Sequence, residues 1–321
     1  IRMGNPELKW QRVLKNNFGL DMTLFKERLV IGFDYFRNTT KDQLMSIPLP
    51  ASTGAEDITV NFGENQNVGY EFSVAAQVIR SKNWAWTTVI NGSHVKDRIN
   101  RISTTLKNTS YQIEEDSPLR LRFREGGSQY DIYAVRSAGI DPATGQEIFI
   151  DRNGEYTFRY DADDEVVVGN TQPKLQGTWL NTLRYKGWSL NFVFSYTFGG
   201  DTYNKTLWEK VENIDPRYNV DERAFTDRWK NPGDLSRYLA IRQTTQTYNS
   251  ERFVERLNEL WLSSATISYE FQAKFLKRLG FKRLAVGVGV TDLVRFSSVK
   301  YERGTSYPYS RTINLMFRPT F

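Results

Sequence analysis

The 321-residue chain contains no cysteine and a single histidine, His94. A disulfide framework and a thiolate metal site are therefore excluded, as is a metal centre built from several histidines. No stretch approaches the roughly 18 consecutive apolar residues of a membrane-spanning helix. The net charge of +6 comes from 43 basic and 37 acidic residues. These are dispersed, without a basic arm or a phosphate-binding Gly-rich loop, so we expect no nucleic-acid binding and no cofactor.

What the chain does have is strict alternation of apolar and polar residues. Over the last eleven residues the apolar positions are Ile313, Leu315, Phe317, Pro319 and Phe321. The clearest case has apolar residues at Trp188, Leu190, Phe192, Phe194, Tyr196 and Phe198, with polar residues at Ser189, Asn191, Ser195 and Thr197. Side chains alternate between the two faces of a strand, so this pattern predicts strands with one apolar face. Strands of roughly 9–11 such residues can cross a bilayer, with the apolar set facing lipid and the polar set facing a lumen.

The pattern predicts nine strands, at residues 14–25, 29–39, 68–78, 84–94, 175–185, 188–198, 257–271, 284–291 and 311–321. Short connections at 26–28, 81–83, 186–187 and 272–282 alternate with long polar segments at 40–66, 95–174, 199–256 and 293–310. Outer-membrane barrels alternate in this way, with tight periplasmic turns and long extracellular loops. The fold class predicted is therefore an all-β transmembrane antiparallel barrel. A soluble β-sandwich would show similar alternation, but it has no reason to place every long loop at one end.

Nine is an odd number, whereas bacterial single-chain barrels have an even number of strands. An open sheet would also leave two unpaired edges in lipid, where each unsatisfied backbone group is costly. The sequence starts at Ile1 and shows no signal peptide. We therefore expect residues 1–321 to be the carboxy-terminal part of a larger barrel.

Several short motifs, in order along the chain, resemble the carboxy-terminal barrel half of SusC/RagA-type TonB-dependent transporters. They are Asn16–Asp21, Leu29–Leu44, Pro48–Gly54, Asn65–Glu71, Asp141–Gln146, Asp151–Gly154, Val168–Lys174 and Tyr307–Thr312. No single motif is specific, but the ordered set covers nearly the whole chain. One departure is Thr291-Asp292-Leu293, where the family usually has Asn-Leu-Phe.

The resemblance implies energy-coupled import of a large nutrient, an oligosaccharide or oligopeptide, across the outer membrane. It implies a barrel of about 22 strands closed by an amino-terminal plug, which lies outside this chain together with the segment that contacts TonB. It also implies a SusD-like surface lipoprotein that covers the barrel as a lid. The expected partners are this lid, the rest of the barrel, TonB and outer-membrane lipid, and the carboxy terminus is expected in the periplasm.

Candidate contact residues for the ligand or the lid are the aromatic side chains of the third long segment: Trp208, Tyr218, Phe225, Trp229 and Tyr238. Sugar rings stack on such side chains and partner proteins dock on them, although the same residues could pack the core of the segment. Packing and binding both stay open from the sequence alone.

Two further patterns have simple structural explanations. Alternating oxygen-bearing residues at Asp151, Asn153, Asp161 and Asp163 are weak calcium candidates, but turn chemistry accounts for the same residue types. Ser93 and His94 are adjacent and therefore point to opposite faces of a strand, which argues against a hydrolase site. We expect no catalysis. The alternatives that stay open are a passive porin or structural barrel and a soluble all-β adhesion or sugar-binding module.

Overall fold

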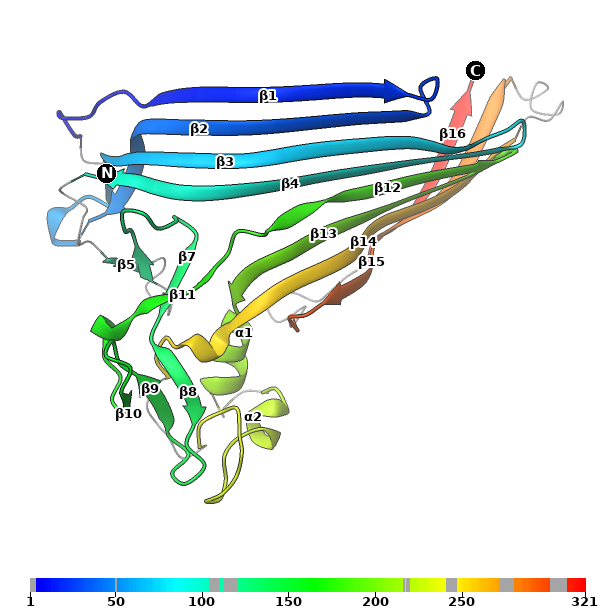
Figure 1. The fold of residues 1–321 in the computed structure, drawn as a ribbon. Coiled ribbons are helices and arrows are strands. Elements are labelled where there is room, and N and C mark those ends of the chain that lie inside the picture. The colour runs from blue at the N-terminus through cyan, green and yellow to red at the C-terminus, as the bar shows by residue number, and fades with distance from the viewer. Residues whose placement is uncertain are drawn as a thin grey trace.

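The computed structural model of the chain describes residues 4–49, 51–103, 110–112, 120–215, 217, 220–240, 247–271, 280–300 and 311–321. The largest element is one nine-stranded antiparallel sheet, whose strands lie next to each other in chain order (Figure 1). The strands are β1 (Arg12–Leu24), β2 (Leu29–Pro48), β3 (Asp57–Arg80), β4 (Trp84–Ile102), β12 (Leu175–Tyr185), β13 (Trp188–Tyr203), β14 (Val254–Phe271), β15 (Arg283–Ser297) and β16 (Ile313–Thr320). Each of the nine predicted strands is present, which confirms the antiparallel all-β fold.

Smaller elements lie in the long connections. Between β4 and β12 are β5 (Ser110–Gln112), β6 (Arg120–Arg122), β7 (Asp131–Ala134), β8 (Arg136–Ile140), β9 (Glu147–Ile150), β10 (Tyr156–Thr157), η3 (Ala162–Asp164) and β11 (Val166–Asn170). Between β13 and β14 are α1 (Lys205–Leu207), η4 (Trp208–Glu212), α2 (Arg223–Thr226) and η5 (Glu251–Phe253), and η1 (Ala51–Thr53) joins β2 to β3. Within the described part of the chain, no helix has the length and apolar character needed to cross a membrane.

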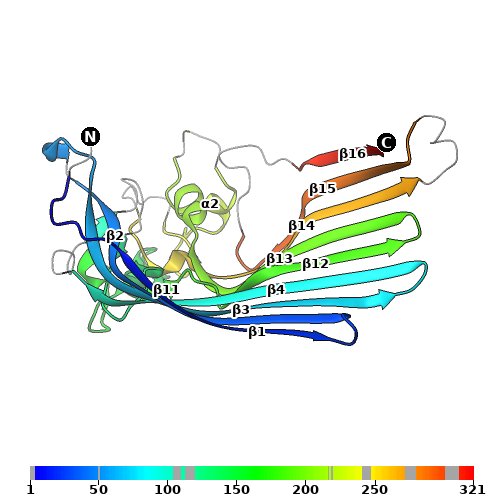
Figure 2. The same cartoon turned by 90° about the horizontal axis from the view of Figure 1, so that it is seen from above.

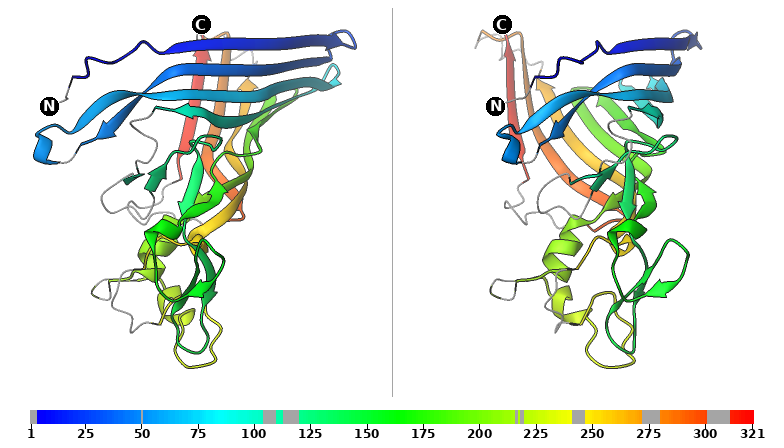
Figure 3. Two further views of the ribbon diagram at one scale, coloured as in Figure 1. Left: turned by 60° about the vertical axis from the view of Figure 1, so that its left-hand side comes forward. Right: turned by 90° about the vertical axis from the view of Figure 1, so that its left-hand side faces the viewer.

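The two ends of the sheet differ. The short connections after β1, β3 and β12 lie together at one end, and the carboxy terminus lies at that same end (Figure 2). The connections that carry the smaller elements lie at the other end, and the sheet itself curves into an open half-shell (Figure 3). Among the described residues, the long connections thus lie at one end of the sheet and the short turns at the other.

The predicted bounds of the long segments were wrong, because the strands run further than expected. Pairing between β2 and β3 continues to Pro48↔Asp57, so most of the predicted loop 40–66 is strand. Likewise β4 continues to Ile102, β13 to Tyr203 and β15 to Ser297, while β14 begins at Val254. Along these extensions the apolar and polar residues no longer follow the membrane pattern, since polar Asn65 and Asp97 are buried there, while the hydrogen-bonded ladder continues. Residues 301–310 and 272–279, from the last long segment and the basic join, lie outside the described residues.

A small core holds the extended ends of β2, β3 and β4 together. It consists of Ile47, Phe62, Ile99, Ile102 and Phe123, and the side chains of Phe62 and Ile99 are fully buried. Beside it, the buried Asp97 carboxylate accepts hydrogen bonds from Asn65 Nδ2 at 2.6 Å, Ser128 Oγ at 3.0 Å and the Gln129 amide at 2.7 Å. These contacts fix Ser128 and Gln129 of the β4–β12 connection against the sheet.

Candidate functional site

The two faces of the nine-stranded sheet have opposite character. Directly opposed residues in a ladder lie on the same face. On one face, Phe194 of β13 opposes Trp179 and Leu262. On the other, Asn191 opposes Thr182 and Thr266. The predicted separation of Trp188, Leu190, Phe192, Phe194 and Tyr196 from Ser189, Asn191, Ser195 and Thr197 is therefore present in the structure.

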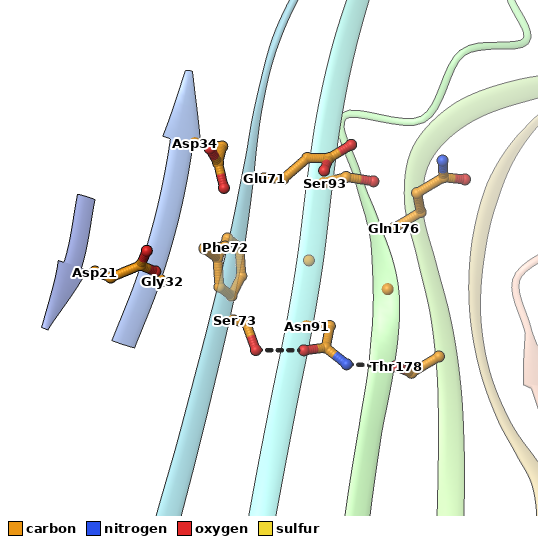
Figure 4. Close-up of a pocket in the computed structure, with 12 residues that line it drawn as sticks. Asp21, Gly32, Asp34, Glu71, Phe72, Ser73, Asn91, Ser93, Gln176 and Thr178 are labelled. Carbon is orange, nitrogen blue, oxygen red and sulfur yellow. Dashed lines mark hydrogen bonds between the residues drawn. The ribbon is translucent and has the colours of Figure 1, made fainter. Parts of the chain in front are cut away.

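The polar face carries a hollow of about 480 Å³ across β1, β2, β3, β4 and β12 (Figure 4). A short hydrogen-bonded chain crosses its floor: Ser73 Oγ donates to Asn91 Oδ1 at 2.7 Å, and Asn91 Nδ2 donates to Thr178 Oγ1 at 3.3 Å. Since Thr178 opposes Ser195 of β13, the polar face of β13 continues this wall.

Three carboxylates line the same hollow, from Asp21, Asp34 and Glu71, and its lining contains no lysine or arginine. Asn17 Nδ2 donates to Asp34 Oδ1 at 3.2 Å. Such a wall can hydrogen-bond a polar solute or a neighbouring protein segment, and its charge favours cationic groups. Ser93 also lines this hollow, whereas the ring of His94 lies on the opposite face, 5.3 Å from that of Tyr70. The two residues therefore cannot form a catalytic pair.

The described residues of the two long connections, 103–174 and 204–253, form one structural unit, which we call the loop module. Val135 and Ser250 form a parallel β-bridge, and the Glu251 amide donates to the Val135 carbonyl at 2.9 Å. Asn249 Nδ2 donates to the Tyr133 carbonyl at 2.9 Å. The rings of Tyr160 and Tyr248 stack with their centroids 4.2 Å apart. Residues far apart in the sequence thus share one folded body.

The loop module has its own hydrophobic core. The buried residues of this core are Tyr203, Leu207, Trp208, Val211, Ala224, Tyr238 and Phe253. The Arg228 guanidinium lies beside it and donates to the carbonyl oxygens of Ala224, Leu239, Val211 and Glu212. These bonds satisfy backbone acceptors that the short helices leave free.

A buried ion cluster links the two connections. Arg252 Nη2 lies 2.9 Å from Glu147 Oε2 and 3.4 Å from Glu212 Oε1. The side chains of Arg252, Glu147 and Glu212 are only 9%, 3% and 0% exposed. Burial acts to lower the pKa of Arg252, but the two carboxylates outweigh it and the pKa is raised. Burial, followed by the Glu147 carboxylate, also raises the pKa of the adjacent Tyr203 hydroxyl.

The predicted aromatic contact residues occupy different environments. Trp208 and Tyr238 are 6% and 4% exposed and belong to the core of the loop module, so packing accounts for both. Trp229 is half-buried; its Nε1 donates to the Pro142 carbonyl at 2.8 Å. Phe225 is 47% exposed and is the member of the set that presents most of its ring. Tyr218 lies outside the described residues.

The weak calcium candidates form turns. Asp151 Oδ1 accepts from the Glu155 amide at 2.8 Å, and this bond is the main cause of the lowered pKa of Asp151. Asp161 Oδ1 accepts from the Asp163 amide at 2.9 Å and caps η3. Asn153 Nδ2 donates to Asp151 Oδ2 at 3.4 Å. Among the described residues, no group of three or more acidic, histidine or cysteine side chains is arranged to hold a metal ion.

Sequence reasoning missed the cluster of Arg252, Glu147 and Glu212. Arg252 and Glu147 are 105 residues apart, and neither belongs to a recognisable motif. Only the pairing of the two connections brings them together.

The comparisons with known proteins agree on one family. The family model described as TonB dependent receptor-like, beta-barrel matches residues 1–293. TonB-dependent receptor P39 of Formosa agariphila is 25% identical over 342 residues, which cover 93% of this chain and 33% of that protein. TonB-dependent receptor SusC of Bacteroides thetaiotaomicron is 24% identical over 279 residues, which cover 84% of this chain and 27% of that protein.

Among solved structures, the RagAB peptide transporter superposes with a TM-score of 0.78 at 21% sequence identity, covering 92% of this chain and 33% of that chain. The RagAB peptide importer in its open-open state also gives a TM-score of 0.78, at 20% identity, covering 99% of this chain and 35% of that chain. These likenesses show a shared fold. The chain thus spans about a third of the length of the relatives it matches.

The matched family consists of receptors and transporters rather than enzymes, which confirms the expectation of a non-enzymatic chain. The match over residues 1–293 favours a receptor barrel over the passive porin and the soluble module. The chain belongs to the TonB-dependent receptor-like β-barrel family of the outer membrane, and it resembles the carboxy-terminal barrel portion of the SusC and RagAB transporters.

Proposed function

We propose that the protein containing this chain imports a large nutrient, an oligosaccharide or oligopeptide, across the outer membrane in a TonB-dependent manner. This chain supplies nine strands of the barrel wall. The missing strands, the plug and the TonB-contacting segment belong to the remainder of the protein. The observation that carries the proposal is the receptor-barrel match over residues 1–293. The SusC and RagAB relatives support it, since RagAB is itself described as a peptide transporter.

The orientation follows from the unequal ends of the sheet. We place the loop module outside the cell and the short turns, with the carboxy terminus, in the periplasm. Protease added to intact cells should cut within the long connections and spare the turn at Lys82. Cleavage at Lys82 with the outer membrane sealed would reverse the orientation.

We further propose that the loop module forms most of the contact with a SusD-like lid and that residues of 199–256 also line the ligand cavity. Loops this long usually have a function beyond closing a barrel. The loop module presents exposed apolar side chains at Leu235 (91%), Tyr156 (73%) and Phe225 (47%). Apolar groups surrounded by charged ones are typical of a specific protein interface.

Surface substitutions test this docking better than removal of the loop, because excising 205–250 would also remove Tyr248, Asn249 and Ser250, which contact residues 131–170. In the full-length receptor, Leu235→Asp with Phe225→Ser should reduce co-purification of the lid and growth on the nutrient. Lys230→Gln, a change at a nearby exposed site, is the control. Normal lid recovery and normal growth in the double variant would remove these residues from the docking surface.

A further inference from the structure

The apolar face of the sheet ends in a row of aromatic side chains at the loop-module end. The register places Phe18, Tyr35, Tyr70 and His94 side by side on β1 to β4. Phe18, Tyr35 and Tyr70 are 67%, 46% and 36% exposed. The amphipathic rings of Tyr35 and Tyr70 are of the type that prefers the headgroup level of a membrane.

A second aromatic row marks the other end of the same face. Trp84 and Tyr185 pack with their ring centroids 4.3 Å apart, and Trp188 and Tyr269 with theirs 4.9 Å apart. Roughly 33 Å of strand lies between Trp84 and His94 at the usual rise per residue. For a strand tilted as in known barrels this is close to the ~25 Å height of the apolar band. The two rows therefore mark the two headgroup levels.

Immediately beyond the first row, the outward face becomes basic. The next cross-strand row is Asn16, Arg37, Val68 and Lys96, and the one after it is Leu14, Thr39, Gln66 and Arg98. These two rows contain three cations and no carboxylate. Arg37, Lys96 and Arg98 are exposed. On β4, Lys96 and Arg98 alternate with Asp97 and Ile99, which are buried on the opposite face of the strand. We call Arg37, Lys96 and Arg98 the basic belt.

The basic belt is available for a ligand outside this chain. If the Gln66 amide is assigned so that its oxygen faces Arg37, that oxygen accepts from Arg37 Nη2 and Nε at 2.9 and 3.0 Å, and Gln66 holds the guanidinium in place without neutralising it. Among the described residues, neither Lys96 nor Arg98 pairs with a carboxylate. By contrast Arg12, further from the aromatic row, pairs with Asp42 at 3.3 Å.

We propose that the basic belt binds the phosphate groups of a lipid headgroup in the membrane leaflet that surrounds the loop-module end of the barrel. The belt continues the lipid-facing surface, lies one to two rows outside the aromatic level, and offers positive charge where anionic headgroups lie. Guanidinium groups match phosphate geometry, and an ammonium adds a compact charge. A partner protein with an acidic surface would contact the loop module at the rim of the barrel. The basic belt lies on the outer wall instead, a position that favours lipid as its ligand.

Binding can be measured on the full-length receptor by native mass spectrometry with lipid A as the probe. The test variant is Arg37→Gln/Lys96→Gln/Arg98→Gln. The matched control, Lys26→Gln/Lys82→Gln/Lys186→Gln, removes the same charge at the short-turn end. With roughly a fivefold effect for each removed charge near an anionic surface, affinity should fall on the order of a hundredfold in the test variant. It should change little in the control. The charge-preserving Arg37→Lys/Arg98→Lys should keep most of the binding.

The wild-type receptor provides an independent arm. It should bind lipid A well above dephosphorylated lipid A, and inorganic phosphate alone should not saturate the site. Equal binding of the two lipids, or full lipid binding by the test variant, would overturn the proposal. A test variant that loses the lid while keeping the lipid would assign the belt to a protein partner instead. Heat-dependent gel mobility reports whether each barrel is folded, and none of these readouts depends on nutrient transport.

Discussion

The Tyr196 hydroxyl on β13 donates a 2.8 Å hydrogen bond to the Asn91 carbonyl on β4, two strands away across β12. The ring passes over Gly177 of β12, where an added Cβ would lie 2.6 Å from the hydroxyl and 1.9 Å from that same carbonyl. The contact lies on the apolar face, where lipid offers no hydrogen-bond donor to a backbone carbonyl. A glycine in the central strand thus allows the tyrosine hydroxyl to reach the backbone of a strand two positions away.

Tyr196→Phe should destabilise the full-length receptor by about 0.5–1.5 kcal/mol, because it removes the cross-strand hydrogen bond to the Asn91 carbonyl. Gly177→Val should cost at least as much, since the side chain would displace the Tyr196 ring. Urea unfolding in detergent micelles measures both changes. Unchanged unfolding midpoints in both variants would show that this contact contributes nothing. Tyr185→Phe, at the turn end, is the control for loss of a hydroxyl.

Phe192→Arg should cost roughly 2–4 kcal/mol if Phe192 lies near the bilayer midplane, because the charge would enter lipid. Asn191→Arg, one residue away but on the polar face, should cost far less. The comparison can be made by unfolding titrations in phospholipid vesicles. Similar penalties for the two substitutions would contradict the assignment of the faces.

Arg252→Leu should loosen the whole loop module. Removal of this cation leaves Glu147 and Glu212 buried without their main counter-charge, a change that typically costs about 3–5 kcal/mol. Hydrogen exchange should accelerate together in 131–170 and 204–253 while the β12–β13 ladder stays protected. Arg217→Ala is the control, since Arg217 pairs with Asp215 at the surface and its side chain is 81% exposed. Faster exchange in only one of the two segments would contradict the single-unit interpretation.

Acid should weaken the contact between Asp221 and Arg223 at the start of α2. The Arg223 hydrogen bond lowers the pKa of Asp221 to about 2, against an ordinary value of 3.8. Since the folded-state pKa is the lower one, the contact stabilises the fold above about pH 4 and loses its effect as the pH falls through about 2. The stability difference between wild type and Asp221→Asn should therefore be constant above pH 4 and vanish toward pH 2. A stability difference that persists at pH 2 would show that it does not come from the charge of Asp221. Glu222→Gln, at a neighbouring exposed carboxylate, is the control.

The sheet was predictable from the sequence because lipid imposes a strict rule on every second residue. Phe192 and Phe194 on one face and Asn191 and Ser195 on the other leave a period-two pattern that needs no tertiary information. Beyond the membrane that rule no longer applies. Asp97 and Asn65 are buried in the extended strands although they are polar, so the pattern ended before the strands did.

The candidate site was predictable only in part. The aromatic residues of 199–256 were recognisable, but the sequence could not distinguish Trp208, which is buried, from Phe225, which is exposed. Whether each of these side chains is buried depends on how the long connections pack in three dimensions. Pairs such as Glu147 and Arg252 follow from the same long-range arrangement, and no local signal encodes it.

The contacts between the two connections of the loop module limit how such receptors can diversify. A new β13–β14 connection grafted from a relative would need its own counterpart for Glu147, a bridge for Val135 and a ring for Tyr160 to stack on. Either connection replaced alone would lose these partners. When receptors of this family change their nutrient or their lid, we therefore expect both connections to change together. A chimaera that exchanges both connections should fold more readily than one that exchanges a single connection.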